Sequence, residues 1–295
     1  MTLEHARSEI VRAFPALPVH EITLLGSGMD SDAYLVNGAW VFRFPRRLAA
    51  SMGLDREIAL LPQLAEFLPV DVPHFEYIGE QPESGLRFVG YRLIPGEPLT
   101  PELFDGLSHE AQERVLRMLS GFLDVVHAFP VHEARAAGVE SISTRSLVAD
   151  TWDTTRDRVL APLSAADGQA VAAFIEGFLA DPHNFLERPR LLYADFAPEH
   201  ILYDRAADEI TGIIDWGDMA IGDPDYDLTY LYQDYGAEFV RRLQVHYQHD
   251  DPDRLYRKLR VFCAYDYLFD IMANTDGSEA VREALDGLRQ LARAV

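Results

Sequence analysis

The N-terminal third of the chain is a series of short β-prone runs separated by turn residues. Asn37-Gly38 is a strong hairpin signal between two such runs, so the first runs are expected to form an antiparallel meander. The expected strands are residues 22–25, 32–36, 40–44, 75–78 and 86–93. A helical segment is expected at about residues 52–67, and Pro62 is expected to kink or end it.

Beyond this region the pattern becomes mostly helical. Apolar residues recur at helical spacing around residues 115–126 and again around residues 171–178, so each segment is expected to bury one face. The run Ile94-Pro95-Gly96-Glu97-Pro98 has the composition of a connector. Two lobes are therefore expected, residues 1–94 and residues 95–295.

Charge limits the possible partners of this chain. Its 295 residues include 26 Lys and Arg against 48 Asp and Glu, a formal net charge of −22. A protein that binds nucleic acid needs cations to meet the phosphates, so nucleic acid is not an expected partner, whereas a cationic small molecule is. Hydrophobic residues make up 48% of the chain, enough for a substantial core, so global disorder is excluded as well.

The sequence also favours a cytoplasmic location. The one cysteine, Cys263, lies in an apolar run and has no partner for an internal disulfide, as is usual in a reducing compartment. No stretch approaches about eighteen consecutive apolar residues, and residues 1–12 lack the apolar region of a signal peptide. A cytoplasmic protein with no membrane partner is therefore expected.

A glycine-rich loop lies between two of the expected strands and contains Gly26, Ser27, Gly28 and Ser31. A dinucleotide-binding fingerprint would need a helix after the loop, so that interpretation fails on context. The functional interpretation that remains is a strand-loop-strand flap over nucleotide phosphates. The alternative is an ordinary hairpin turn.

Arg43 and Glu57 form a predicted pair. Alternation along residues 40–44 places three aromatic side chains on one face of the strand and Arg43 on the other. Glu57 follows on the next helix, on or beside its apolar stripe, where a carboxylate is costly unless a cation meets it. Arg43 is the nearest candidate for that cation. The alternative is that Glu57 borders the solvent.

Three further residues have the spacing of a phosphate-transfer site. Asp195 is followed five residues later by His200, and Asp215 comes at the end of a β-branched run, just before Trp216-Gly217. Protein kinases use the same offsets for a catalytic base, a metal ligand and a second metal ligand. Phosphoryl transfer needs one carboxylate to accept the proton of the attacking hydroxyl and others to hold Mg²⁺ on the phosphates. The alternative is that these acids only cap turns.

These segments resemble the aminoglycoside phosphotransferase family, small-molecule kinases that share the protein-kinase fold. Within the family, the chain most resembles the enzymes that modify the 2''-hydroxyl of aminoglycosides. The resemblance is carried by residues 41–45, 96–99, 191–204, 213–218, 221–227 and 234–240. It implies an α+β, bilobal fold, with an antiparallel β-sheet and one main helix in the N-terminal lobe. The C-terminal lobe would be mostly helical, with small β-hairpins carrying the catalytic loop.

The resemblance also implies site residues. Asp195 would be the catalytic base, and His200 and Asp215 would hold Mg²⁺. Arg43 would contact the α- and β-phosphates of ATP or GTP and pair with Glu57. The purine of the nucleotide would contact the backbone near Arg92 and Ile94. Asp227 would brace the catalytic loop from below.

Acids near the C-terminus are candidates for the acceptor site. Asp266 and Asp270 lie four residues apart, hence on one face of a helix, and Asp234 precedes them. Carboxylates fix ammonium groups by charge-assisted hydrogen bonds, so these three acids suit a polycationic sugar. A solvated acidic face is the alternative for each of them.

The chain departs from the usual family pattern at three places. Tyr193-Ala194 precede Asp195 where most members have His-Gly or His-Asn, Arg43 replaces the usual lysine, and His200 replaces the usual asparagine. The leading expectation is a monomeric, Mg²⁺-dependent aminoglycoside kinase with a role in antibiotic resistance. A kinase for a macrolide or another small metabolite, and a nucleotide-binding pseudoenzyme, stay open as alternatives.

Overall fold

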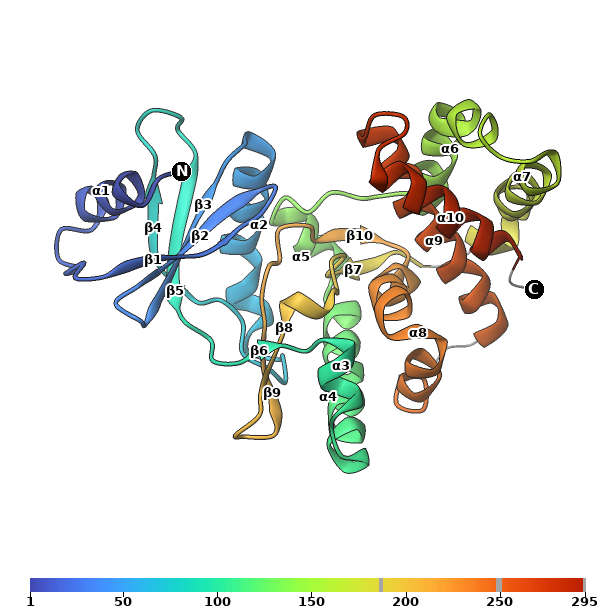
Figure 1. Ribbon diagram of the computed structural model, residues 1–295. Coiled ribbons are helices and arrows are strands. Elements are labelled where there is room, and N and C mark those ends of the chain that lie inside the picture. The colour runs from blue at the N-terminus through green and yellow to red at the C-terminus, as the bar shows by residue number, and fades with distance from the viewer. Residues whose placement is uncertain (186–187, 248–250, 294–295) are drawn as a thin grey trace. The chain divides into compact units, whose positions relative to one another are not determined.

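The chain folds as two compact units, seen in the ribbon of Figure 1. The computed structural model describes residues 1–185, 188–247 and 251–293. Unit 1 comprises Met1–Val139 and Ala197–Met219, and unit 2 comprises Glu140–Phe196 and Ala220–Val295. The lobe boundary expected after residue 94 stays a prediction.

Unit 1 contains a five-stranded antiparallel sheet in the order β1-β2-β3-β5-β4. Its strands are β1 (Ile22–Ser27), β2 (Ser31–Val36), β3 (Trp40–Pro45), β4 (Phe75–Glu80) and β5 (Arg87–Arg92). Asn37 and Gly38 turn β2 into β3 with φ of 52° and 65°, the left-handed conformation that a tight hairpin turn requires. The expected meander is confirmed.

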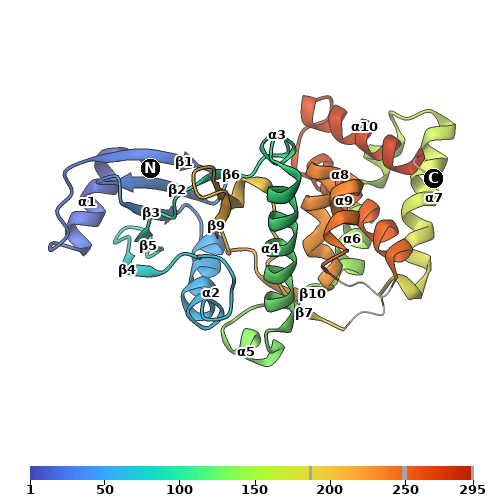
Figure 2. The ribbon, with the colours of Figure 1, turned by 90° about the horizontal axis from the view of Figure 1, so that it is seen from below.

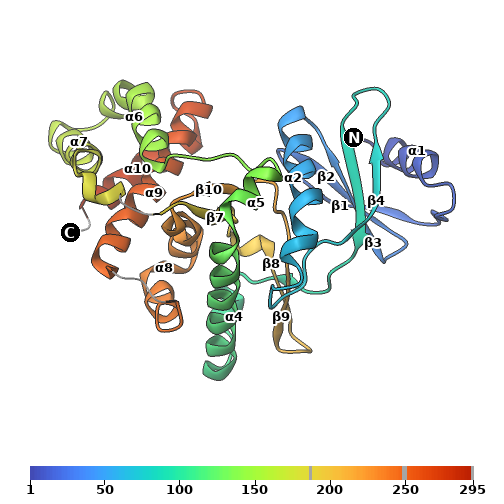
Figure 3. The same cartoon turned by 180° about the vertical axis from the view of Figure 1, so that it is seen from behind.

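Two helices cover the two faces of this sheet, as Figure 1 and the view from behind in Figure 3 show. Helix α1 (Leu3–Ala13) packs on the face that carries Trp40, Phe42 and Phe44, and Phe88 stacks on Phe44 with ring centroids 4.5 Å apart. Helix α2 (Leu48–Leu64) covers the other face. It begins four residues earlier than expected. It ends at Leu64, two residues after Pro62, which has no amide hydrogen and so removes one hydrogen bond from the last turn.

The rest of unit 1 is built from three helices and a small sheet. The helices are α3 (Pro101–Asp105), α4 (His109–Ala128) and α5 (Val131–Ala136). The sheet has the order β6-β8-β9, with β6 (Glu97–Pro98), β8 (Ile201–Asp204) and β9 (Glu209–Ile213), and a short 3₁₀ turn η2 (Pro198–His200) precedes β8. Because β6 pairs with β8, the segment after residue 94 is tied to residues 197–219, which explains why both belong to unit 1.

Unit 2 is mostly helical, as Figure 2 shows, and its helices at residues 144–160, 165–180, 252–273 and 279–293 share one apolar core. The helices of unit 2 are α6 (Thr144–Leu160), α7 (Ala165–Ala180), α8 (Thr229–Leu243), α9 (Pro252–Ala273) and α10 (Glu279–Arg293). Ser143, Ser164 and Asp251 cap the starts of α6, α7 and α9 by accepting backbone hydrogen bonds. Helix α9 packs against both α6 and α10.

A two-stranded ladder completes unit 2. Strand β7 (Arg190–Leu192) pairs antiparallel with β10 (Ala220–Gly222), and 3₁₀ turns lie at η1 (Pro182–Phe185) and η3 (Pro224–Leu228). The α+β fold class and the small β elements around residue 195 are therefore confirmed. In the described part of the chain, no helix combines the length and the apolar character needed to cross a membrane.

Candidate functional site

Unit 1 holds a buried charge cluster formed by Arg43, Glu57 and Asp215. The guanidinium of Arg43 donates to both carboxylate oxygens of Glu57 at 3.0 Å, and it also donates to Oδ1 of Asp215 at 3.0 Å. Glu57 is fully buried, whereas the side chain of Asp215 is 48% exposed. The predicted Arg43–Glu57 pair is present, and its planar, two-point geometry is the one that arginine offers and lysine does not.

Close packing of α2 against residues 215–217 brings the cluster together. A Cβ added to Gly53 would lie 2.9 Å from the carbonyl oxygen of Gly217, so only glycine permits this approach. Arg56 donates to the same carbonyl oxygen at 3.0 Å, and the indole nitrogen of Trp216 donates to the carbonyl oxygen of Ile213. Helix, strand end and turn are thus fixed to one another at the point where the three charges meet.

Burial dominates the electrostatics of this cluster. It raises the pKa of Glu57 to about 7, against the opposing pull of Arg43, and nearby Asp215 adds to the rise. The pKa of Arg43 is raised by Glu57 and Asp215 despite burial, which on its own would lower it. Arg43 therefore stays cationic in any accessible pH range, held by two carboxylates.

His200 and Asp215 lie beside each other, as expected for two ligands of one ion. Nε2 of His200 is 3.9 Å from Oδ2 of Asp215, the oxygen that Arg43 leaves available. Asp215 adopts a φ of 59°, a left-handed conformation that costs energy for a residue with a Cβ. Such strain is typical of a side chain that is aimed at a ligand.

The donor set of this pair limits the metal that it can hold. Among the described residues, no group of three or more His, Cys, Asp or Glu side chains is arranged around a metal position. Mg²⁺ usually takes one or two protein ligands and completes its octahedron with phosphate oxygens and water. His200 and Asp215 therefore fit a Mg²⁺ ion that is shared with a nucleotide, and they do not fit a metal held by protein alone.

The glycine-rich loop is an exposed turn between β1 and β2. The amide of Gly28 donates to the carbonyl oxygen of Ser31 at 3.0 Å, and Arg46 donates to the carbonyl oxygen of Gly28. The hydroxyl of Ser27 donates to Asp32 at 2.6 Å, while Gly26 has open space around its Cα. In this conformation the loop forms its own hydrogen bonds, and its role over phosphates stays a prediction.

The predicted purine contacts lie at the end of β5. Arg92 is exposed, with its guanidinium carbon 4.0 Å above the ring of Trp40, a cation–π contact that orients the strand end. Ile94 is buried and packs over Gly212 of β9, where an added Cβ would lie 2.6 Å from its side chain. A purine contact at either backbone position is not tested by this geometry.

In unit 2, the loop that carries Asp195 is held from within by Asp227. The amide of Tyr193 donates to Oδ2 of Asp227 at 3.1 Å, and the amide of Ala194 donates to Oδ1 at 2.7 Å. Asp227 is 1% exposed, and Tyr193 is fully buried beside Phe196. Ala194 has a φ of 70°, so the residue before Asp195 is strained in the left-handed region. The bracing contact implied for Asp227 is present.

The acids predicted to bind the acceptor gather in unit 2 around Asp266 of α9. Burial raises the pKa of Asp266 to about 7, and the carboxylates of Asp270, Asp195 and Asp234 raise it further. Oδ2 of Asp266 is buried and has no hydrogen-bond partner. Asp234 and Asp270 are exposed. An unpartnered carboxylate oxygen among three like charges is an arrangement that a bound cation would stabilise.

A buried ion cluster next to Asp227 was not predicted from the sequence. Nζ of Lys258 on α9 lies 2.6 Å from Asp223 and 2.6 Å from Asp225, and its side chain is fully buried. The two acids flank Pro224: Asp223 caps the start of the 3₁₀ turn that carries Asp227, and Asp225 lies within that turn. The sequence feature that could have predicted the cluster is the position of Lys258 within the apolar stripe of its helix. A cation buried there requires a buried acid beside it.

These features define the class of the protein. An antiparallel sheet with one long helix, an arginine–glutamate pair joining them, and a loop acid braced by a buried aspartate together form a kinase-like arrangement. The chain belongs to the phosphotransferase enzyme family (APH), which residues 21–262 match.

The chain is also similar to solved structures and to one curated protein. The GDP and kanamycin complex of APH(2")-IIIa is 31% identical in sequence, with 97% of this chain and 98% of that chain covered and a TM-score of 0.91. The macrolide 2'-phosphotransferase MphH from Brachybacterium faecium is 23% identical over 96% and 97% of the chains, with a TM-score of 0.68, a likeness of fold alone. The uncharacterized protein YcbJ of Bacillus subtilis (strain 168) is 23% identical over 70% of this chain and 67% of its own.

Proposed function

We propose that the protein is a Mg²⁺-dependent O-phosphotransferase that moves the γ-phosphate of a nucleoside triphosphate to a hydroxyl of an aminoglycoside-like polycation. Membership of the phosphotransferase family supports the reaction class. The proposal of a polycationic substrate rests on Oδ2 of Asp266, which is buried without a hydrogen-bond partner near the carboxylates of Asp195, Asp234 and Asp270. A neutral acceptor would leave that group of like charges uncompensated.

Asp195 is the proposed catalytic base. It accepts the proton of the acceptor hydroxyl while the new oxygen–phosphorus bond forms and the bond from the γ-phosphorus to the β–γ bridging oxygen breaks. The nucleoside diphosphate is the leaving group. Asp227 supports this role because its two hydrogen bonds fix the backbone of the two residues before Asp195.

Unit 1 supplies the proposed nucleotide-binding residues. Arg43 presents a permanent positive charge to the phosphates, and Glu57 prevents that side chain from changing its direction. Mg²⁺, when bound by His200 and Asp215, would neutralise charge on the phosphate oxygens. The relative with GDP and kanamycin makes GTP the first donor and kanamycin the first acceptor to be tested.

Acceptor binding is assigned to the acids of unit 2. Asp266 would receive one ammonium group in the buried part of the cluster, and the exposed Asp234 and Asp270 would receive others. A cytoplasmic setting fits this proposal, because the donor nucleotides are available there and the buried thiol of Cys263 has a raised pKa that keeps it unreactive.

The role of Asp195 is tested by Asp195→Asn. This change keeps the size of the side chain and removes the proton acceptor, so turnover is expected to fall about 10²–10⁴-fold. The melting temperature and the affinity for Mg²⁺-nucleotide should stay close to wild type. Asp150→Asn, at an exposed position of α6, removes the same charge from unit 2 and should leave turnover unchanged. Full turnover in Asp195→Asn would refute the proposed mechanism.

The acceptor class is tested by coupled turnover assays with GTP and with ATP. The panel contains kanamycin, a macrolide, and small hydroxylated amines such as choline. Phosphorylation of kanamycin with either nucleotide is the expected result. Transfer to the macrolide alone would assign the protein to the macrolide kinases, and nucleotide binding without transfer to any acceptor would make it a pseudoenzyme.

A further inference from the structure

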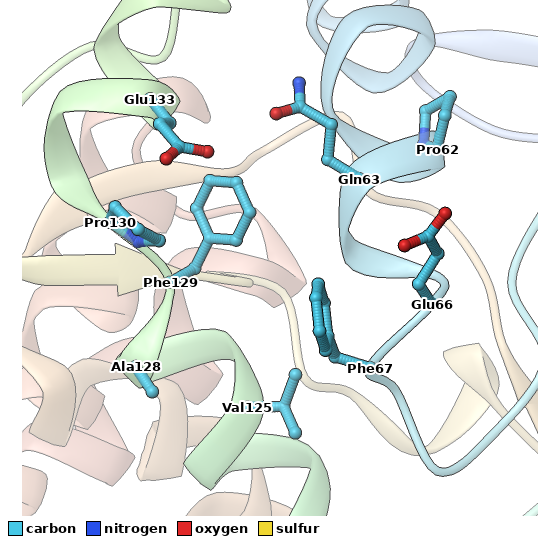
Figure 4. A pocket seen from close by; sticks show the side chains of 9 residues that line it. All are labelled: Pro62, Gln63, Glu66, Phe67, Val125, Ala128, Phe129, Pro130 and Glu133. Atoms are coloured by element: carbon cyan, nitrogen blue, oxygen red, sulfur yellow. The ribbon is translucent and has the colours of Figure 1, made fainter.

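A cavity within unit 1 is lined by none of the residues assigned above. It has a volume of about 680 Å³, in the range of small-molecule sites, and Figure 4 shows its lining. The end of α2 and the residues after it form one wall, and the junction of α4 with α5 forms the other. The lining residues are Pro62, Gln63, Glu66, Phe67, Val125, Ala128, Phe129, Pro130 and Glu133.

The apolar part of this cavity is suited to an aromatic or aliphatic body. Phe67 is 66% exposed although it is a large aromatic residue, and Phe129 forms the inner surface at 9% exposure. Figure 4 shows both rings directed into the cavity, with Val125 beneath them. An exposed phenylalanine at the mouth of a hollow is a common feature of binding sites, because a ligand would remove its ring from water.

The polar part of the cavity contains only hydrogen-bond acceptors. The side-chain nitrogen of Gln63 donates to the carbonyl oxygen of Ala59 at 2.9 Å, so its remaining oxygen is the atom turned to the cavity. Glu133 faces Gln63 from the opposite wall in Figure 4, and Glu66 lies at the rim beside Phe67. None of the lining residues is a lysine, arginine or histidine. Two carboxylates and one amide oxygen call for a ligand that donates several hydrogen bonds and carries positive charge.

We infer that this cavity binds an organic cation with an apolar body, of the aryl-alkylammonium class. Its ammonium group lies between Glu133 and Gln63, and its ring packs on Phe67 and Phe129. An aminoglycoside does not fit this description, because it has no apolar body to cover the two rings. The site is therefore distinct from the acceptor site proposed in unit 2.

An occupant of this cavity also acts on α2. Pro62 and Gln63 belong to the last turn of the helix, and Glu57 lies on the same helix, five residues before Pro62. A ligand that bridges the end of α2 to Phe129 and Glu133 adds contacts that the free protein lacks. Binding should therefore raise the melting temperature, and the rise should follow the logarithm of the ligand concentration once that exceeds the dissociation constant.

The direct test is calorimetric titration of the protein, without nucleotide or acceptor, at pH 8. The probe is 4-phenylbutylamine, and its neutral and anionic counterparts are 4-phenylbutanol and 4-phenylbutyrate. The amine should bind about tenfold more tightly than the alcohol, with no detectable binding of the carboxylate. Equal affinity for amine and alcohol would overturn the inference.

Variants locate the binding. Glu133→Gln should weaken the amine about tenfold and leave the alcohol unchanged, whereas Phe67→Ala should weaken both. Glu83→Gln, an exposed change in the β4–β5 turn of the same unit, controls for net charge and should leave both affinities unchanged. Asp270→Asn tests whether the amine binds to the acids of unit 2 instead of to the cavity. Loss of amine binding in Asp270→Asn or Glu83→Gln, or its retention in Glu133→Gln, would show that the probe binds elsewhere.

Discussion

Ala194 is strained at the position that precedes the proposed base. Its φ of 70° lies in the left-handed region, which costs a residue with a Cβ about 1 kcal/mol relative to glycine. The amide hydrogen bond to Asp227 holds it there. A glycine at this position would adopt the same conformation without that cost.

Ala194→Gly is expected to stabilise the protein because it removes this strain. The free energy of unfolding, measured by urea denaturation, should rise by about 1 kcal/mol. Ala136→Gly, at the exposed end of α5, is the matched control and should be destabilising or neutral. A loss of stability in Ala194→Gly would show that the left-handed conformation costs nothing at this position.

Asp266 should affect stability and acceptor binding in opposite directions. Its carboxylate is raised in pKa to about 7 by burial and by neighbouring acids, so in the folded state it holds a proton that the unfolded chain releases near its ordinary value of 3.8. By linkage, this group makes the folded state less stable as the pH rises from about 4 to about 7. Asp266→Asn removes the penalty and should add about 4 kcal/mol at pH 8 and less than half of that at pH 5.

The same variant should bind the acceptor less well. Without the carboxylate, KM for kanamycin should rise about tenfold, while KM for the nucleotide stays unchanged. Denaturation at the two pH values and steady-state kinetics measure the two effects independently. A variant that is neither more stable nor weaker in acceptor binding would remove Asp266 from the acceptor site.

Sequence patterns predicted those site residues that are marked by their close neighbours along the chain. Arg43 and Glu57 were recognised because strand alternation and helix spacing each left a charge at a place where burial is costly. Gly53 and Arg56 were missed, since their importance comes from the approach of α2 to Gly217, which lies 161 residues away from Arg56 in the sequence. No local pattern records such a contact.

At the scale of elements, Lys258 joins α9 to the turn that carries Asp227. Its ammonium group is fully buried between Asp223 and Asp225. Nearby acids raise its pKa, although burial alone would lower it. Because Asp227 holds the backbone before Asp195, this ion cluster is expected to position the catalytic loop as well as to stabilise unit 2.

Lys258→Met should leave two buried carboxylates uncompensated and cost about 3–5 kcal/mol of unfolding free energy. The triple variant Lys258→Met/Asp223→Asn/Asp225→Asn removes all three charges and should recover most of that loss. If the cluster also positions the loop, the triple variant should turn over more slowly at an unchanged KM for the nucleotide. Recovery of both stability and wild-type kcat would limit the cluster to a structural role.

Element boundaries were predicted best where a turn residue or cap marks them. Asn37-Gly38 fixes the β2–β3 hairpin, and the strand ends there agree with the expectation. Helix α2 was expected to start later, because Leu48–Ser51 lacks an apolar period and Arg47 offers no side-chain cap. The start of this helix is set by its packing against the sheet.

At the scale of the whole molecule, the order of the elements along the chain was predictable and the division into compact units was not. Local patterns described residues 197–219 as β-rich, but only the pairing of β6 with β8 shows that this segment belongs with the first half of the chain. Strand pairing over about a hundred residues depends on contacts that local periodicity does not encode.

The net charge of −22 leads to a prediction about the whole molecule. A strongly anionic protein attracts a polycationic acceptor and repels a nucleotide polyanion, and salt screens both effects within a Debye length of about 10 Å at 0.1 M. Raising KCl from low concentration to about 0.5 M should therefore increase KM for kanamycin roughly tenfold. KM for Mg²⁺-GTP should fall or stay constant over the same range.

The control for this experiment is the salt dependence of KM for a macrolide acceptor, measured beside that of kanamycin. A singly charged macrolide gains little from the field of the protein, so its KM should change much less with salt than that of kanamycin. Tetramethylammonium chloride at matched ionic strength separates screening from competition by the potassium ion for the carboxylates. If KM for kanamycin did not depend on salt, the surplus of acids would have no part in acceptor capture, and binding would rest on the few carboxylates around Asp266.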